Sequence, residues 1–382
     1  MTFATRKESL RKTRDRFQEF SEKELGRTQS QLEGREEFNW EGWDSCASFG
    51  VMALPVDPIF GGEGAGMSRI IEALQGLGYG CRDNGLLLSI NAHLWGCQLP
   101  VSTFGSDSLR KKYLPLLSSG KLVGAHAISE PEAGSDIFSL STTARLDGDK
   151  YILNGTKTFV TNGTVADIVV VLARCKGKDG MGELSAFLLE KDSPGFKVDK
   201  KLGKMGLRTA EMAQLKLLEC RIPKCNRIGH EGIGQALFGH VMEWERSCIM
   251  APALGSMQAV LERTICHAKE RIQFGKPISK QPEVARRIIQ MKTRIQTSSL
   301  LLKQVGELKD VGRSVLMEAS LAKLYVSECW IQNCLDAMGV HGGYGYLTDI
   351  GIEKELRDAM GSQFYSGTPE IQRLTAAKLM GL

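Results

Sequence analysis

A glutamate interrupts an apolar stripe in the last third of the chain. The stripe recurs at the spacing of one helix face: Phe238, Met242, Glu245 and Ile249. A carboxylate among apolar side chains has its charged form disfavoured, which raises its pKa toward the range in which a general base works. From the residues alone, Glu245 is either such a base or half of a structural ion pair with an arginine. Glu243 falls on another helix face.

A polar, glycine-containing loop over Ile128–Asp136 suits a ring carbonyl or a phosphate as ligand. Its consecutive N–H groups and the hydroxyls of Ser129 and Ser135 could bind either group. A simple connecting loop has a similar composition. Two further segments, Phe159–Gly163 and Arg271–Pro277, combine aromatic and polar residues and are weak signals when each is taken alone.

Other motifs that carry chemistry are missing. The run Gly342–Gly345 follows a helical segment and not a strand, so it lacks the context of a dinucleotide-binding fingerprint. No P-loop occurs. The ten cysteines are dispersed without a Cys-x-x-Cys pair or zinc spacing, so we expect mostly buried thiols and no metal site.

Three zones of different periodicity must position these groups. Up to about residue 120 the apolar residues recur at helical spacing. From about 123 to 225, short apolar runs and turn signals at Asp147-Gly148 and Asn154-Gly155 predict a small antiparallel β-domain. Helical spacing returns in four later segments: 232–270, 281–308, 313–341 and 350–361. We predict an α+β, mostly helical chain with an N-terminal helical domain, a middle β-domain and a C-terminal helical bundle over residues 1–122, 123–228 and 229–382.

The composition is that of an ordinary soluble globular protein. The 382 residues are 42% hydrophobic, and 49 basic residues against 44 acidic ones give a net charge of +5. Basic and acidic residues are interspersed, which argues against a nucleic-acid-binding stripe. No apolar run approaches the ~20 residues of a membrane span, and the N-terminus lacks the apolar core of a secretory signal. We expect a cytoplasmic protein that binds neither nucleic acid nor membranes.

Taken in order and spacing, four motifs resemble those of the acyl-CoA dehydrogenase family of flavoproteins. They are Ser129–Asp136, Phe159–Gly163, Arg271–Lys276 and Phe364–Gln372. The resemblance runs from about residue 60 to the C-terminus. It implies a helical domain, a β-barrel domain and a four-helix bundle, assembled as a homotetramer with FAD at a subunit interface.

The resemblance also implies which residues contact FAD. The loop and strand facing the isoalloxazine ring contribute Ile128, Ser129, Gly134, Ser135, Phe159, Val160 and Thr161. Arg271 and Phe274 reach the FAD of a neighbouring subunit, whereas Thr368 and Glu370 contact the FAD of their own subunit.

Three glycines complete the cofactor site that the resemblance implies, and three further residues form the implied substrate site. Gly342 and Gly343 form the family's Gly-Gly pair, and Gly339 stands where many members have Gln. The residues implied at the substrate are Ser135, Trp244 and Arg246.

One position departs from the pattern. Much of the family has Glu in the place of Ser366, as the base that removes the substrate α-proton. A hydroxyl is a far weaker base, and no neighbouring histidine could activate it. Isovaleryl- and long-chain acyl-CoA dehydrogenases carry the base on the earlier helix, just before the position of Arg246. The resemblance therefore makes Glu245 the base, while Ser366 keeps a catalytic role through its backbone N–H.

A narrower group is also similar. Trp244-Glu245-Arg246, Tyr365-Ser366-Gly367-Thr368 and Asn91-Ala92-His93 resemble segments of the L-prolyl-carrier-protein dehydrogenases of pigment and antibiotic pathways. This similarity implies natural-product biosynthesis on an acyl or aminoacyl thioester carried by the phosphopantetheine arm of a carrier protein. Glu245 would take the α-proton while a hydride leaves for flavin N5.

Three alternatives remain from the sequence. A short- or branched-chain acyl-CoA dehydrogenase would act on a CoA thioester. A flavin monooxygenase on the same fold would not need Glu245. A non-catalytic, DNA-associated homologue would carry a basic C-terminal extension after the last flavin motif.

Overall fold

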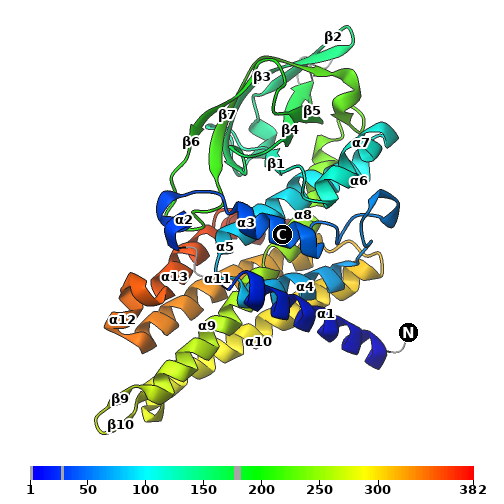
Figure 1. Ribbon diagram of the computed structural model, residues 1–382. Helices are drawn as coiled ribbons and strands as arrows, with labels where there is room; N and C mark the ends of the chain where they lie inside the picture. Colours follow the sequence, from blue (N-terminus) through cyan, green and yellow to red (C-terminus); the bar gives the residue numbers. More distant parts are fainter. Residues whose placement is uncertain (1–2, 27–29, 176–181) are drawn as a thin grey trace.

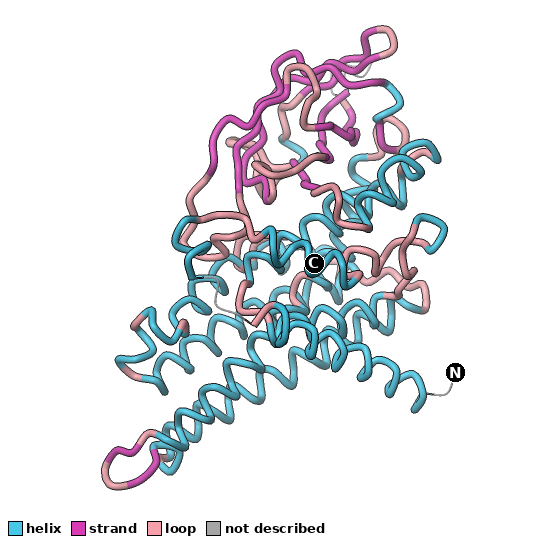
Figure 2. The backbone as a smooth tube through the Cα atoms, in the orientation of Figure 1, coloured by secondary structure: helices cyan, strands magenta, loops and turns pink. Residues whose placement is uncertain are grey.

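Most strands of the protein gather at one end of the molecule, and helices build the rest apart from a short two-stranded hairpin at the opposite end (Figure 1). The computed structural model describes residues 3–26, 30–175 and 182–382. The order along the chain is helices, strands and helices, as the periodicity predicts. Figure 2 shows the strands set apart from the helices. Within these ranges no helix is long and apolar enough to cross a membrane.

Helices occupy the N-terminal part of the chain. They are α1 (Phe3–Glu24), α2 (Ser30–Arg35), α3 (Trp40–Phe49), α4 (Met67–Gly80), α5 (Asn84–Asn91), α6 (Leu99–Phe104) and α7 (Asp107–Ser118). A π-helix, Ala92–Gln98, joins α5 to α6. Polar side chains cap three of these helices. Asn39 precedes α3, Asp83 precedes α5 and Ser106 precedes α7, and each accepts a backbone N–H.

The middle of the chain forms an eight-stranded sheet. Its strands are β1 (Gly124–Ala127), β2 (Thr143–Asp147), β3 (Lys150–Thr161), β4 (Ile168–Cys175), β5 (Glu183–Glu190), β6 (Phe196–Lys201), β7 (Met212–Pro223) and β8 (Arg227–Ile228). The order is β6-β7-β3-β2-β4-β5-β8, and β1 pairs with β4. Most pairs are antiparallel, but β1 and β2 both run parallel to β4. The prediction of a purely antiparallel domain is wrong for these two pairs, because long connections to β4 permit parallel pairing.

One predicted turn lies inside a strand. Asp147-Gly148 joins β2 to β3 as expected, whereas Asn154-Gly155 lies within β3, where the register with β7 shifts. A Cβ atom on Gly155 would lie 2.3 Å from Oγ1 of Thr142. The glycine therefore marks a bulge with a close approach of two segments, and the two runs predicted as separate strands are one.

The described part of the protein has two hydrophobic cores, and strand β4 contributes side chains to both. Ile168, Val170 and Leu172 face the core that the helices share, while Val169, Val171 and Ala173 face the interior of the β-domain. Because successive side chains of a strand point to opposite faces, a strand buried on both faces reads as a continuous apolar run. The ten cysteines are free, and all but Cys225 and Cys266 are buried.

Helices return after the sheet. They are α8 (Gly234–Cys248), α9 (Ala251–Glu270), α10 (Pro282–Asp310), α11 (Leu316–His341), α12 (Gly343–Tyr346), α13 (Ile352–Gly361) and α14 (Pro369–Leu379). The segment predicted over 232–270 is two helices, since Pro252 lacks an N–H and stands in the first turn of α9. The hairpin of β9 (Ile272–Gln273) and β10 (Lys276–Pro277), and helix α14, were not predicted.

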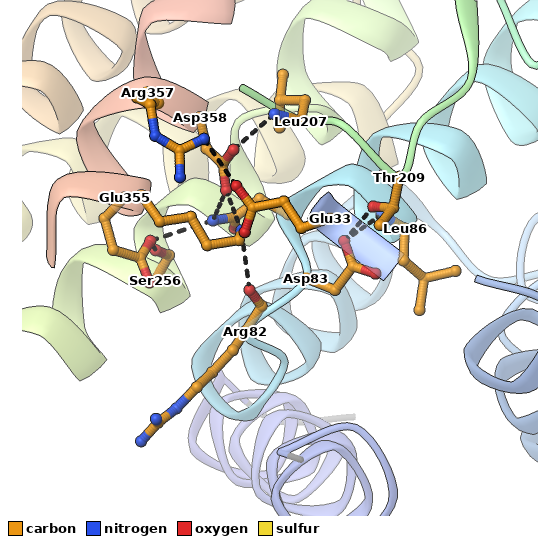
Figure 3. A network of polar contacts seen from close by, with 12 residues as sticks. Glu33, Arg82, Asp83, Leu86, Leu207, Thr209, Ser256, Glu355, Arg357 and Asp358 are labelled. Carbon is orange, nitrogen blue, oxygen red and sulfur yellow. Dashed lines mark hydrogen bonds and ion pairs between the residues drawn. The ribbon is translucent and has the colours of Figure 1, made fainter. Parts of the chain in front are cut away.

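A buried acidic network ties α13 to three other parts of the fold (Figure 3). Asp358 accepts the N–H of Leu207, after β6, at 2.6 Å, and the amide of Asn84, on α5, at 3.1 Å. Glu355 accepts the same amide and, at 2.8 Å, the hydroxyl of Ser256 on α9. Since α13 ends five residues before Ser366, this network holds the start of the loop that carries Ser366.

Candidate active site

Helix α8 and the loop between α13 and α14 meet at a carboxylate. The hydroxyl of Ser366 donates a hydrogen bond of 2.6 Å to Oε1 of Glu245. Burial raises the pKa of Glu245, while the Ser366 hydroxyl and the charges of Arg246 and Lys323 act in the opposite direction. The net shift is upward, so this carboxylate holds a proton more readily than an exposed glutamate does.

Arg246 donates a hydrogen bond to the loop that carries Ser366 and not to the carboxylate of Glu245. Its Nε donates to the carbonyl of Ser366 at 3.2 Å, and its Nη1 donates to the hydroxyl of Ser320 at 2.9 Å. In the described part of the chain, no salt bridge joins Glu245 to an arginine. The interpretation of Glu245 as half of a structural ion pair therefore finds no support in the contacts.

The backbone around Ser366 is held by its carbonyl groups. Ser366 has a φ of +56°, in the left-handed region that a serine rarely adopts. The buried ammonium of Lys323 donates to the Gly367 carbonyl at 2.6 Å, and Gln372 donates to the carbonyls of Ser366 and Gly367 at 2.8 and 3.0 Å. Among the described residues the N–H of Ser366 has no acceptor, so this donor is available to a ligand.

Glu243 faces a different environment. Its carboxylate forms an ion pair with Lys309 and accepts hydrogen bonds from the hydroxyl of Ser314 and, at 3.3 Å, the N–H of Val315. Burial would raise the pKa of Glu243, but these donors outweigh it and the net shift is downward. The two glutamates of α8 therefore differ in kind, since one is tied to a cation and the other is not.

The Trp244 side chain packs against the π-helix. Its ring stacks on that of Trp95, with centroids 5.7 Å apart and an interplanar angle of 20°. Trp95 in turn donates to Asn91 at 2.8 Å. The ring of His93 contacts the N–H of Gly124 and burial lowers its pKa to about 4, so it is neutral at physiological pH. The Asn91–His93 segment therefore supports the tryptophan beside Glu245.

The predicted flavin loop and flavin strand lie together. The N–H of Thr158 donates to the Ser129 carbonyl at 2.8 Å, and the Lys157 ammonium donates to the Ile128 carbonyl at 2.9 Å. Lys157 also forms a fully buried ion pair of 2.8 Å with Glu130. Phe159, next along the strand, is 64% exposed, whereas Val160 is buried.

A second group of predicted residues lies at the opposite end of the molecule (Figure 1). Arg271, Phe274, Gly342 and Gly343 line a concavity of about 690 Å³ beside the β9–β10 hairpin. Phe274 is 92% exposed. The structure does not bring this group to Glu245 within one chain.

Three family models match consecutive parts of the chain. The acyl-CoA dehydrogenase N-terminal domain matches residues 7–121, the middle domain matches 125–220 and the C-terminal domain matches 231–381. The chain belongs to the acyl-CoA dehydrogenase family.

Individual members of the family are similar over nearly the whole chain. An L-prolyl-[peptidyl-carrier protein] dehydrogenase of Pseudomonas fluorescens is 37% identical over 89% of this chain and 90% of its own. The crystal structure of the prolyl acyl carrier protein oxidase AnaB is 46% identical, with a TM-score of 0.94 over 98% of this chain and 99% of AnaB. A structure of PigA with FAD and proline is 35% identical, with a TM-score of 0.93 over 98% of each chain.

This acyl-CoA dehydrogenase family member is an FAD-dependent dehydrogenase that acts on a CH–CH bond of an acyl thioester. The described residues fit FAD. A Cβ atom on Gly134, Gly342 or Gly343 would meet no atom within 4 Å, so each backbone is open to a ligand. Phe159 holds a large ring in solvent at a φ of +55°, which is typical of a ligand-binding residue.

Sequence reasoning missed three residues that hold the backbone of the predicted site: Lys157, Lys323 and Gln372. Lys323 carries the same signal as Glu245, because it stands among apolar positions of one helix such as Ala319 and Val326. Gln372 has no such signal, since its role depends on how the loop before α14 folds back.

Removing the Ser366 hydroxyl is expected to raise the pKa of Glu245. In Ser366→Ala the carboxylate loses a hydrogen bond that favours its charged form. A smaller fraction of Glu245 is then deprotonated at a given pH, so the ascending limb of the pH profile for flavin reduction should move to higher pH. The measurement is anaerobic stopped-flow reduction of the bound flavin by a prolyl thioester between pH 5 and 9.

Ser362→Ala is the matched control, since this nearby hydroxyl donates to the carbonyl of Ala359 and not to Glu245. A limb that stays in place in Ser366→Ala, or moves to lower pH, would contradict the pKa argument.

Proposed function

We propose that Glu245 is the base that removes the α-proton of the thioester. The observation that carries this is the 2.6 Å contact of Ser366 with Glu245, which sets a carboxylate of raised pKa beside the available N–H of Ser366. A base works best when its pKa lies near the operating pH. Neither Ser366, a hydroxyl, nor Glu243, tied to Lys309, meets that requirement.

Ser366 contributes through its backbone in this mechanism. An α-C–H of a thioester is a weak acid, so the negative charge that develops on the carbonyl oxygen must be stabilised by aimed donors. The N–H of Ser366 is such a donor, and the contacts of Lys323 and Gln372 with the adjoining carbonyls hold it in place. Bound FAD would supply the acceptor for the hydride that leaves the neighbouring carbon. Glu245 receives the proton, and a double bond forms between the α-carbon and the neighbouring atom that loses the hydride.

The Glu245→Gln substitution tests the base. Glutamine keeps the size and can still accept a hydrogen bond from Ser366, but it has no basicity. Flavin reduction by substrate should fall by about 10²–10⁴, the range of a positioned general base, while FAD stays bound. The measurement is anaerobic bleaching of the flavin, which does not depend on the reoxidation partner.

Glu243→Gln is the control on the same helix, and its flavin should be reduced at a nearly native rate. If Glu245→Gln were reduced as fast as the native protein while Glu243→Gln was inactive, the base would be misassigned.

We further propose that the substrate is an aminoacyl thioester, prolyl in the first instance, on the phosphopantetheine arm of a carrier protein. The support is similarity, at 46% identity with AnaB and 37% with the Pseudomonas enzyme. The combination of a base on α8 with serine at position 366 points the same way. The proposal places the protein in natural-product biosynthesis.

Presenting one acyl group on two carriers separates this proposal from a CoA-dependent enzyme. L-Prolyl on a phosphopantetheinylated carrier protein should reduce the flavin at least ~10-fold faster than L-prolyl-CoA, because only the first offers a protein surface to the enzyme. Butyryl-CoA serves as the control for an ordinary acyl-CoA dehydrogenase. Equal rates with the two prolyl thioesters, or a preference for butyryl-CoA, would refute the carrier-protein proposal but leave Glu245 as the base.

We also propose a homotetramer in which Arg271 and Phe274 reach the flavin of a neighbouring subunit. These two residues follow the end of α9 that lies away from helix α8, which carries Glu245 (Figure 1), and this supports a site built from two copies. The native mass in solution should be four times the 42.0 kDa of one chain. Light scattering behind a sizing column measures it, and a monomer that still holds FAD firmly would exclude the shared site.

A further inference from the structure

The guanidinium of Arg287, on α10, occupies the space beside Gly339, on α11. A Cβ atom on Gly339 would lie 2.4 Å from Nη1 and 3.1 Å from Cζ of Arg287. Close-packed protein atoms do not tolerate the shorter of these distances. Arg287 in this position and any side chain at position 339 therefore exclude each other. An arginine from another helix thus occupies the volume that a side chain at position 339 would take.

The guanidinium of Arg287 is only partly paired within the chain. It donates to Asp336 at 3.4 Å, but Arg294 binds the same carboxylate more closely, at 2.7 Å. The Arg287 side chain is 40% exposed. In the described part of the protein its remaining N–H donors have no acceptor. Arg287 therefore offers several donors and a positive charge to a ligand.

Neighbours of Arg287 and Gly339 line the concavity that contains Arg271. Val284, one helical turn before Arg287, lines that concavity, and so does Val340, next to Gly339. Among the described residues the lining contains no carboxylate. A second guanidinium beside Arg271 makes this end of the molecule suited to an anion with more than one phosphate group.

We propose that Arg287 is a nucleotide-binding residue for FAD, and that its guanidinium contacts the diphosphate. Arg287 reaches the diphosphate by leaving its long contact with Asp336, which Arg294 continues to neutralise.

The test is flavin binding by the apoprotein, measured by quenching of flavin fluorescence. Arg287→Met keeps the length of the side chain and removes its charge. The Kd for FAD should rise about 10-fold or more, as expected for loss of a charged hydrogen bond. The Kd for FMN, which lacks the diphosphate, should change far less. Added NaCl should weaken FAD binding by the native protein more steeply than by the variant.

Arg286→Met is the matched control, because Arg286 is the neighbouring arginine of α10 and pairs with Glu283 at 2.9 Å. It removes the same charge and should bind FAD as the native protein does. Native mass is measured for each variant. If Arg287→Met lost FAD together with its assembly, Arg287 would be a structural residue and the proposal would be overturned.

A second pair of variants tests whether a glutamine amide at position 339 can replace the Arg287 guanidinium as a donor. Gly339→Gln alone should weaken FAD binding, since its side chain and Arg287 compete for one space. Adding Gly339→Gln to Arg287→Ala should strengthen FAD binding relative to Arg287→Ala alone. Additive losses in the double variant, or a native Kd and native salt dependence in Arg287→Met, would overturn the proposal.

Discussion

The hydrogen bond from Ser366 to Glu245 joins two elements that the sequence separates by more than a hundred residues. It exists only if the loop after α13 folds back over α8. That loop begins where α13 is held by the buried network around Asp358 and ends where Thr368 caps α14. The contacts of Leu207 and Ser256 with α13, which Figure 3 shows, therefore help to position Ser366, as does the contact of Asn84 with α13.

Three buried cations hold the backbone of the site in the same way. Lys157 donates to the carbonyl of Ile128, Arg246 to that of Ser366 and Lys323 to that of Gly367. Burial disfavours the charged form and lowers the pKa of Lys323 to about 8. The hydrogen bond to a carbonyl offsets part of that cost. The contacts with the Ser366 and Gly367 carbonyls fix the backbone that directly follows the N–H of Ser366, which has no acceptor among the described residues.

Sequence patterns predicted the parts of this site that depend on local spacing. The apolar stripe of α8 separates Glu245 from Glu243, and their contacts with Ser366 and Lys309 match that separation. The order of helices and strands followed from periodicity. The parallel partners of β4 did not, because pairing depends on the paths of long connections. Likewise nothing local indicates that Arg287 lies on Gly339, since the two residues meet only when α10 packs on α11.

In the proposed mechanism the base and the backbone N–H come from two different residues. The base, Glu245, belongs to helix α8, whereas the N–H belongs to Ser366, in a loop where the φ of this residue is +56°. The Ser366 hydroxyl then has a second consequence besides its effect on the pKa of Glu245. It also holds the residue whose N–H would donate to the substrate carbonyl against the carboxylate of Glu245. The loop must therefore be held independently, and Arg246, Lys323 and Gln372 provide that support.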